Sequence, residues 1–131
     1  MIKLEVNYQV KITPQWGVFL QNLAKHASRI LKIKRSLSLS VVFVDNPTIK
    51  KINKRYRGIN KVTNVLSFEE INEIFICYTQ AKKRVQKQQK TLKEEIGLLF
   101  IHGLLHLLGF NHQTKKEAQI MEELQNKILK S

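Results

Sequence analysis

The sequence predicts a single α+β domain over residues 1–131, with four strands and about five helices. Three observations support this fold class. Short apolar segments with strand-like alternation and longer segments with a 3.6-residue period follow one another along the chain. No repeat, low-complexity linker or shift in composition divides the chain into two units. Capping-box patterns mark the expected starts of the last two helices.

The first half of the chain predicts two strands, each followed by a helix. Alternation over residues 1–10 indicates a half-buried strand, and Pro14 is expected to open a helix that continues to Leu31. Residues 37–44 are apolar on both faces toward their end, which is typical of a central strand. Asp45, Asn46 and Pro47 then predict the start of a short helix. The residues expected to face inward from this helix are Ile49, Ile52 and Tyr56.

The second half predicts two more strands and three helices. Residues 57–61 indicate a loop, and residues 62–68 and 73–78 indicate strands joined by a tight connection. Thr79 is expected to cap a basic helix running toward Lys90. Thr91 with Glu94, and Thr114 with Glu117, have the capping-box spacing that begins a helix. The last helix is expected to bury Ala118, Met121, Leu124 and Ile128.

The charge of the chain favours a polyanionic partner. Twenty-three Lys and Arg against ten Asp and Glu give a formal charge of +13, and a surplus of this size makes nucleic acid the first candidate. The alternative is an AT-rich genome that enriches lysine. The lone Cys77 excludes an internal disulfide and suggests a reducing, cytoplasmic location. No signal-peptide or membrane-spanning pattern is recognised, so no membrane attachment is expected.

Three of the four histidines lie within eleven residues and predict a metal site. His102 and His106 are four apart and share one face of a helix. Gly109 is expected to end that helix in a left-handed turn, which returns His112 toward the pair. Three imidazoles with a free fourth position form an open catalytic site for one Zn²⁺ per chain. The alternative is a pair of core histidines bonded to backbone carbonyls; His26, in another helix, is expected to be solvated.

Gly103 separates this site from that of the zinc peptidases. The H-x3-H-x2-G-x2-H spacing is that of the metzincin proteases. In those enzymes the residue after the first histidine is a glutamate that acts as general base. Gly103 can neither accept nor donate a proton, so the pattern indicates a metal hydrolase that is not a peptidase.

Three segments resemble the YbeY family of bacterial endoribonucleases, zinc-dependent factors of ribosomal RNA maturation. H-G-L-L-H-L-L-G-F-N-H at residues 102–112 resembles the family signature H-G-x-L-H-L-x-G-[YF]-D-H. N-K-R-Y-R-G at 53–58 and T-N-V-L-S-F at 63–68 are similar to its N-x-x-[YF]-R-x and T-[DN]-V-L-S-F blocks. I-F-I-C at 74–77 resembles the strand that follows.

The resemblance implies an α+β fold with a small, mostly parallel four-stranded sheet, and a zinc site formed by the three histidines at the end of a central helix. It further implies cleavage of single-stranded RNA, in particular during maturation of the 3′ end of small-subunit ribosomal RNA. It also implies a part in ribosome quality control, with ribosome-associated proteins as partners. Asn111 departs from the family aspartate, which removes a carboxylate beside the last histidine. The connection over residues 69–72 also looks shorter than usual, and Asn72-Glu73 stands where the family has Gly-Asp.

RNA cleavage develops negative charge on phosphate oxygens, so the chemistry needs cations there. The expected catalytic residues are Arg57, which the resemblance places at the substrate phosphate, and His112. A guanidinium suits this role because its planar fork can bind two phosphate oxygens. The alternative for Arg57 is a surface arginine in a basic patch. The expected RNA-binding residues are Lys54, Arg55, Lys61, Lys82, Lys83 and Arg84.

Two other functions remain open at this point. One is a metzincin-like zinc peptidase, against which Gly103 argues. The other is an RNA- or ribosome-binding factor whose zinc is structural. Metal removal distinguishes these, because loss of a structural zinc unfolds a protein whereas loss of a catalytic zinc can leave the fold intact. The attacking group, water or a 2′-hydroxyl, and the oligomeric state are also left open.

Overall fold

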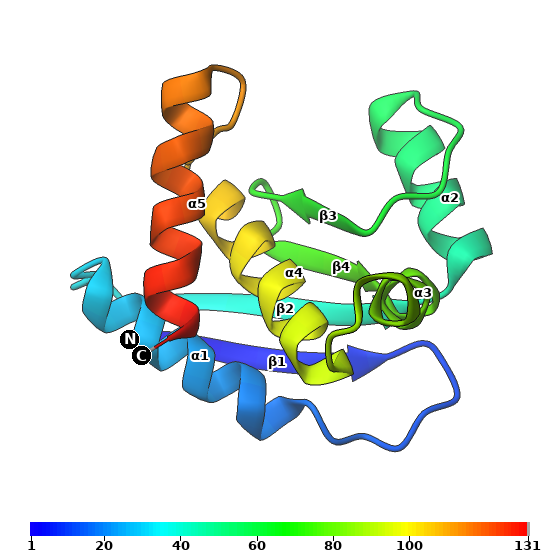
Figure 1. Cartoon of the computed structure of the whole chain (residues 1–131), viewed down its shortest axis with the longest axis horizontal. Helices are drawn as coiled ribbons and strands as arrows, with labels where there is room; N and C mark the ends of the chain where they lie inside the picture. Colours follow the sequence, from blue (N-terminus) through cyan, green and yellow to red (C-terminus); the bar gives the residue numbers. More distant parts are fainter. Residues whose placement is uncertain (131) are drawn as a thin grey trace.

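Four strands form one mixed sheet in the order β1-β2-β4-β3 (Figure 1). The computed structural model describes residues 1–130. β1 (Ile2–Tyr8), β2 (Leu37–Val44) and β4 (Glu73–Cys77) run parallel, and β3 (Val65–Phe68) pairs antiparallel with β4 at the edge. β2 lies between β1 and β4, as its apolar composition predicted. The predicted α+β class with a mostly parallel sheet is therefore confirmed.

Within residues 1–130, five helices cover the two faces of the sheet unequally. α1 (Gly17–Ile30), α3 (Tyr78–Gln88), α4 (Leu92–Leu107) and α5 (Lys115–Leu129) contribute to the main core on one face. α2 (Asn46–Arg57) lies on the other face over a smaller apolar cluster. That cluster consists of Val42, Val44, Ile49, Leu66 and Cys77. No helix within residues 1–130 is long and apolar enough to cross a membrane.

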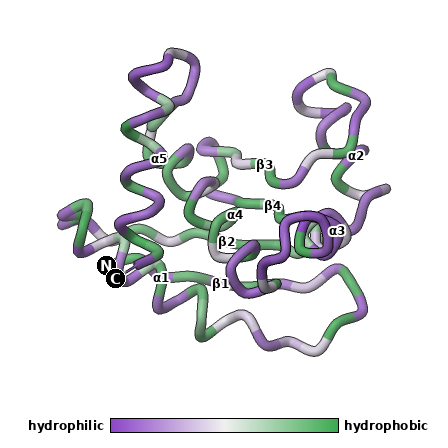
Figure 2. Tube along the Cα trace, viewed as in Figure 1, coloured by the Kyte–Doolittle hydropathy of each residue, from purple (hydrophilic) through white to green (hydrophobic). Residues whose placement is uncertain are grey.

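α4 is the central helix of the main core. It is apolar around most of its circumference, and Phe100, Ile101 and Leu104 are fully buried. Gly97 allows α1 and α5 to approach it closely, because a Cβ there would lie 3.1 Å from Phe19 and 3.4 Å from Leu129. Figure 2 shows this concentration of apolar residues along α4 and the central strands, whereas the outer ends of α2 and α5 are hydrophilic.

The predicted helix starts are confirmed where a side chain caps the helix. Asp45 accepts a hydrogen bond from the Thr48 amide at 3.1 Å. Both capping boxes form, and each pairs a threonine with the glutamate three residues later. The N-terminal ends of α4, the helix that carries His102 and His106, and of α5, which follows His112, are therefore fixed by local sequence.

Several predicted boundaries were wrong because tertiary contacts override local signals. The first helix begins at Gly17 and not at Pro14, because the Trp16 amide donates to the Tyr8 hydroxyl and ties that segment to β1. β3 is shorter than residues 62–68, because Asn53 binds the Lys61 carbonyl and holds that part of the chain against α2. The first strand spans Ile2–Tyr8 instead of residues 1–10.

Other corrections concern side-chain placement. Tyr78 begins α3 and packs edge-on against Phe43, so Cys77 takes the N-cap position predicted for Thr79, and the helix ends at Gln88. Arg57 is the last residue of α2 and not a loop residue. Tyr56 is 64% exposed instead of buried, because α2 covers only part of its sheet face. His26, expected to be solvated, is half-buried, with its Nδ1 shielded from solvent and without a hydrogen-bond partner within residues 1–130.

Candidate metal centre and its cleft

His102, His106 and His112 converge, with one possible ligand atom from each lying within 4.8 Å of the others. The first two come from successive turns of α4. Gly109, at φ 97°, ends the turn after the helix in the predicted left-handed conformation. The Nε2 atoms of His102 and His106 are 3.2 Å apart. Two nitrogens bound to one tetrahedral zinc lie about 3.3 Å apart, so the triad could hold a metal ion without rearrangement of this pair.

Gln125 fixes the orientation of the His102 ring. Its Oε1 lies 2.7 Å from His102 Nδ1, and an amide oxygen only accepts hydrogen bonds. Nδ1 must therefore carry the proton, which leaves the Nε2 lone pair free for a metal. Gln125 comes from α5 and is 9% exposed. The sequence did not predict this contact, because Gln125 lies 23 residues after His102 and no known motif links a glutamine to a histidine at that distance.

The environment favours neutral imidazoles. Burial lowers the pKa of His102, although the Gln125 hydrogen bond opposes that shift. Burial, followed by the charges of His102, His112 and Arg57, lowers the pKa of His106 to about 4. Neutral imidazole is the form that binds metal, so the donor set fits a bound cation. The effect of Arg57 also places its charge within electrostatic reach of His106.

Gly103 lies where α4 approaches the sheet most closely. A Cβ at this position would lie 2.8 Å from Ile74 Cγ2, 3.0 Å from Ser67 Oγ and 3.4 Å from Val65 Cγ2. The Ser67 hydroxyl donates to the Gly103 carbonyl at 3.0 Å. The position after the first histidine therefore faces β3 and β4 and has no room for the glutamate of a metzincin.

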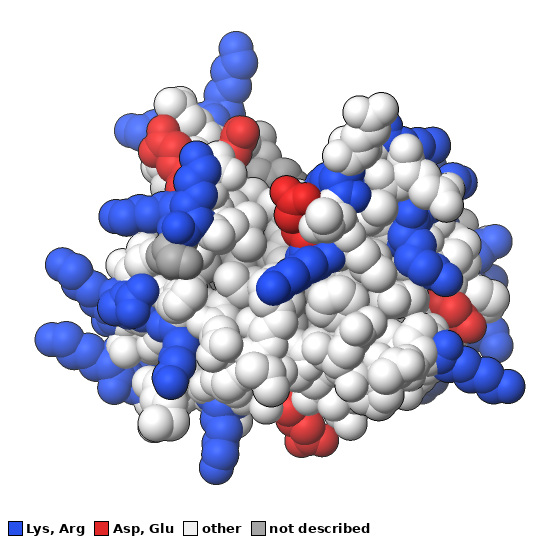
Figure 3. Space-filling view, turned by 60° about the horizontal axis from the view of Figure 1, so that its bottom comes forward, with Lys and Arg blue, Asp and Glu red and all other residues white. Residues whose placement is uncertain are grey.

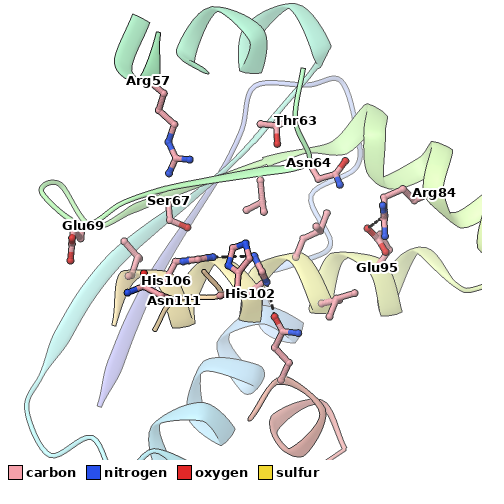
Figure 4. A pocket seen from close by; sticks show the side chains of 16 residues that line it. Arg57, Thr63, Asn64, Ser67, Glu69, Arg84, Glu95, His102, His106 and Asn111 are labelled. Atoms are coloured by element: carbon pink, nitrogen blue, oxygen red, sulfur yellow. Dashed lines mark hydrogen bonds and ion pairs between the residues drawn. The ribbon is translucent and has the colours of Figure 1, made fainter. Parts of the chain in front are cut away.

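The histidines open into a cleft of about 570 Å³. Figure 4 shows the Arg57 side chain, from the end of α2, pointing into the cleft from the side opposite His102 and His106. Its guanidinium carbon lies 6.0 Å from the centre of the Phe68 ring, a cation–π contact that helps orient it. The other polar residues lining the cleft are Thr63, Asn64, Ser67, Glu69, Arg84, Glu95, Asn111 and Gln125.

A buried ion pair lies at the far end of this cleft (Figure 4). Glu95 is fully buried, and its two oxygens lie 2.9 Å from Arg84 Nε and 2.5 Å from Lys90 Nζ. The pair joins α3, and the segment after it, to the first turn of α4. The sequence did not predict this ion pair. Glu94 and Glu95 are adjacent glutamates in the sequence, and only the fold shows that Glu95 is the one that faces inward.

The predicted RNA-binding residues have different locations. Arg84 alone lines the cleft, where Glu95 engages its Nε. Lys54 and Arg55 are exposed on α2, and Lys61 is exposed in the loop that follows. Lys82 and Lys83 are exposed on α3. In Figure 3, Lys and Arg side chains gather on both sides of the visible face, while its centre carries few.

An α+β fold with a mostly parallel sheet, and three histidines that could hold a metal ion at an open cleft, are together typical of the class of metal-dependent hydrolases. The sequence model of the Endoribonuclease YbeY family matches residues 3–131. The chain belongs to the YbeY endoribonuclease family. The resemblance inferred from its histidine and arginine segments is thus confirmed, and with it the assignment to enzymes that cleave RNA.

Individual relatives agree with this assignment. Endoribonuclease YbeY of Acholeplasma laidlawii is 43% identical over 136 residues, which cover 96% of this chain and 95% of that protein. The enzyme of the same name from Mesoplasma florum is 34% identical, covering 96% of this chain and 82% of its own. The solution structure of a Thermotoga maritima protein aligns with a TM-score of 0.63 at 25% identity, covering 95% of this chain and 88% of its own. The peptidase alternative is not favoured.

Proposed function

We propose that this protein is a zinc-dependent endoribonuclease that cleaves single-stranded RNA during ribosomal RNA maturation. One observation carries the proposal: Arg57 and the histidine triad reach into the same cleft from opposite sides. The relatives named Endoribonuclease YbeY supply the substrate class. Ribosomal RNA, the 3′ end of the small-subunit RNA in particular, and ribosome-associated partners follow from the family resemblance. A lone, buried Cys77 suits the cytoplasm, where this RNA is processed.

The metal is proposed to be zinc, held by His102, His106 and His112. Three imidazoles without a thiolate or a carboxylate are typical of an open zinc site. When bound, zinc supplies a Lewis acid for a phosphate oxygen and lowers the pKa of water to about 7. Gln125 keeps the His102 ring in the tautomer that such a site needs.

The remaining chemistry is assigned to the polar groups around the histidines. Arg57 binds two oxygens of the reacting phosphate through its planar fork and stabilises the charge that develops there. Asn111 lines the cleft beside His112 and can orient a ligand through its amide, but it cannot act as a base at neutral pH. Glu95 is engaged by two cations and is therefore assigned a structural role.

The exposed cations are proposed to bind the RNA backbone away from the reacting phosphate. Lys54, Arg55 and Lys61 extend the Arg57 side of the cleft along α2 and its following loop. Lys82 and Lys83 project from α3, the helix that also carries the cleft residue Arg84. Contacts of this kind add affinity without sequence preference.

The test compares Arg57→Ala with Arg29→Ala, which removes an exposed arginine from α1. Single-turnover cleavage of a single-stranded RNA is measured at saturating protein, alongside a binding titration. Losing one charged donor to the developing phosphate charge is expected to reduce the rate about 10²- to 10³-fold. The change in affinity is expected to be much smaller. Arg57→Lys should restore only part of the rate, and Arg29→Ala should cleave normally.

Metal removal tests the alternative of an RNA-binding factor with a structural zinc. A chelator, or His112→Ala, should abolish cleavage and leave the circular dichroism spectrum unchanged, because His112 is exposed beyond the end of α4. Unfolding on chelation would support a structural zinc. An Arg57→Ala protein that cleaves at the wild-type rate when saturated would reduce Arg57 to a docking residue.

A further inference from the structure

A second groove, of about 600 Å³, lies beside the metal cleft. We call it the aromatic groove; its residues are Tyr56, Arg57, Ser67, Phe68, Glu69, Glu70, Ile71, Glu73 and Phe75. Arg57, Ser67 and Glu69 line both the aromatic groove and the metal cleft. A ligand bound at the metal cleft can therefore continue into the aromatic groove past Arg57.

Three aromatic rings form a continuous row in the aromatic groove. Tyr56 and Phe68 meet edge to face with centroids 5.5 Å apart, and Phe68 and Phe75 do so at 5.9 Å. Tyr56 is 64% exposed, and its hydroxyl has no hydrogen-bond partner within residues 1–130. Arg55 lies over the Tyr56 ring at 5.6 Å. An exposed aromatic ring flanked by arginines is the surface on which unpaired bases stack in proteins that bind single strands.

The three carboxylates of the aromatic groove disfavour a phosphate there and favour a base. Glu69, Glu70 and Glu73 line it, and none of them forms an ion pair within the described part of the chain. Free carboxylates repel a phosphate, but they accept hydrogen bonds from the amino and imino groups at the edge of a base. Arg57 stands where the two grooves meet, so a nucleotide can place its phosphate at Arg57 and a base on the aromatic side.

We propose that the aromatic groove is a base-binding subsite, in which the unpaired base next to the phosphate at Arg57 stacks on Tyr56 and Phe68. The inference rests on the proposed cleavage of single-stranded RNA and adds the place of one base. It also gives a reason for a preference for single strands, because a base paired in a duplex must first be unpaired and unstacked, at a cost of about a few kcal/mol, before it can enter the groove. Tyr56 acts here as a binding residue and takes no part in bond breaking.

The test measures the coupling between Tyr56 and one base of the substrate. Zinc-loaded wild type and Tyr56→Ala are titrated with a short, fluorescein-labelled single-stranded RNA and with a set of the same RNA made abasic at each position in turn. Wild type should lose roughly tenfold in affinity at one position beside the cleavage point, the size of one base–aromatic stack. Tyr56→Ala should bind the intact RNA about tenfold more weakly and lose nothing further at that position.

Two controls keep the result interpretable. Tyr56→Phe retains the ring and should bind like wild type, whereas Val18→Ala alters an exposed apolar residue of α1 outside both grooves. If removal of the base lowers RNA affinity equally in wild type and in Tyr56→Ala, the proposed base-binding subsite is wrong. Cleavage is followed on the same samples, so a protein that shows the coupling but never cuts would refute the proposed function and retain the subsite.

Discussion

At the scale of single residues, Gly103 sets how closely α4 approaches the sheet. We expect Gly103→Ala to lower the free energy of unfolding by about 1–3 kcal/mol, since the new methyl group would overlap Ile74 and Ser67. Gly17→Ala is the matched control, because nothing lies within 4 Å of a Cβ at that helical position. Urea unfolding of both variants measures the difference, and equal stabilities would show that β3 and β4 move aside at little cost.

Gln125 is expected to influence metal binding indirectly, through its hydrogen bond with His102. We expect Gln125→Leu to weaken zinc binding about 10- to 100-fold, because the His102 ring loses the acceptor that fixes its tautomer. Gln119→Leu is the control, because Gln119 lies on the exposed side of α5 and its side-chain amide donates a hydrogen bond to the exposed Glu123. Competition with a chromophoric chelator gives both affinities. Unchanged zinc affinity in Gln125→Leu would mean that packing alone orients His102.

At the scale of elements, the Glu95 ion pair fastens α3 and the following segment to the start of α4. Removing Arg84 and Lys90 together, as a double Gln variant, leaves a fully buried carboxylate without a cation and should cost about 3–5 kcal/mol. Glu95→Gln should cost less, because the Arg84 and Lys90 side chains are 36% and 20% exposed and can turn toward water.

Urea unfolding of the two variants tests this asymmetry. Glu122→Gln, which changes an exposed carboxylate of α5, serves as the control and should have little effect. If Glu95→Gln proves the more destabilising variant, Glu95 supports the fold mainly through contacts other than the ion pair.

The elements also show how far sequence reasoning reaches. Periodicity and capping residues predicted every strand and helix, because signals such as Thr91 with Glu94 act within one turn. Placement that depends on distant partners was not predictable. Tyr56 was expected inside because its spacing matches Ile49 and Ile52, yet α2 extends past the sheet it covers. The histidine triad was found from spacing alone, whereas Gln125 and the aromatic groove arise only when separate segments fold together.

At the scale of the whole molecule, the +13 charge predicts salt-dependent RNA binding. Each phosphate contact to a single strand contributes about 0.7 to the slope of log affinity against log salt. Replacing Lys54 and Arg55 by Gln should therefore reduce that slope by roughly 1.4, if both contact phosphates. The same double change at Lys34 and Arg35, exposed residues that line neither groove, is the control.

Titrations of single-stranded RNA across a salt series measure these slopes. Equal reductions in the two double variants would mean that the charge acts as a diffuse field instead of through residues on the Arg57 side of the cleft. A wild-type affinity that does not change with salt would mean that the surplus of lysine reflects composition and not RNA binding.

The close approach at Gly103 also restricts how this enzyme can change over evolutionary time. A glutamate after the first histidine is all that the local sequence lacks for the peptidase pattern, and at the codon level that change is small. In the fold the same substitution is a large change, because Ile74 and Ser67 occupy the space that the glutamate side chain would need. Ile74 is β-branched, so it has few alternative rotamers that would make room. A hydrolase that uses a glutamate at this position would therefore first need substitutions in β3 and β4. Each intermediate variant would be less stable than the present protein before it gained any new activity.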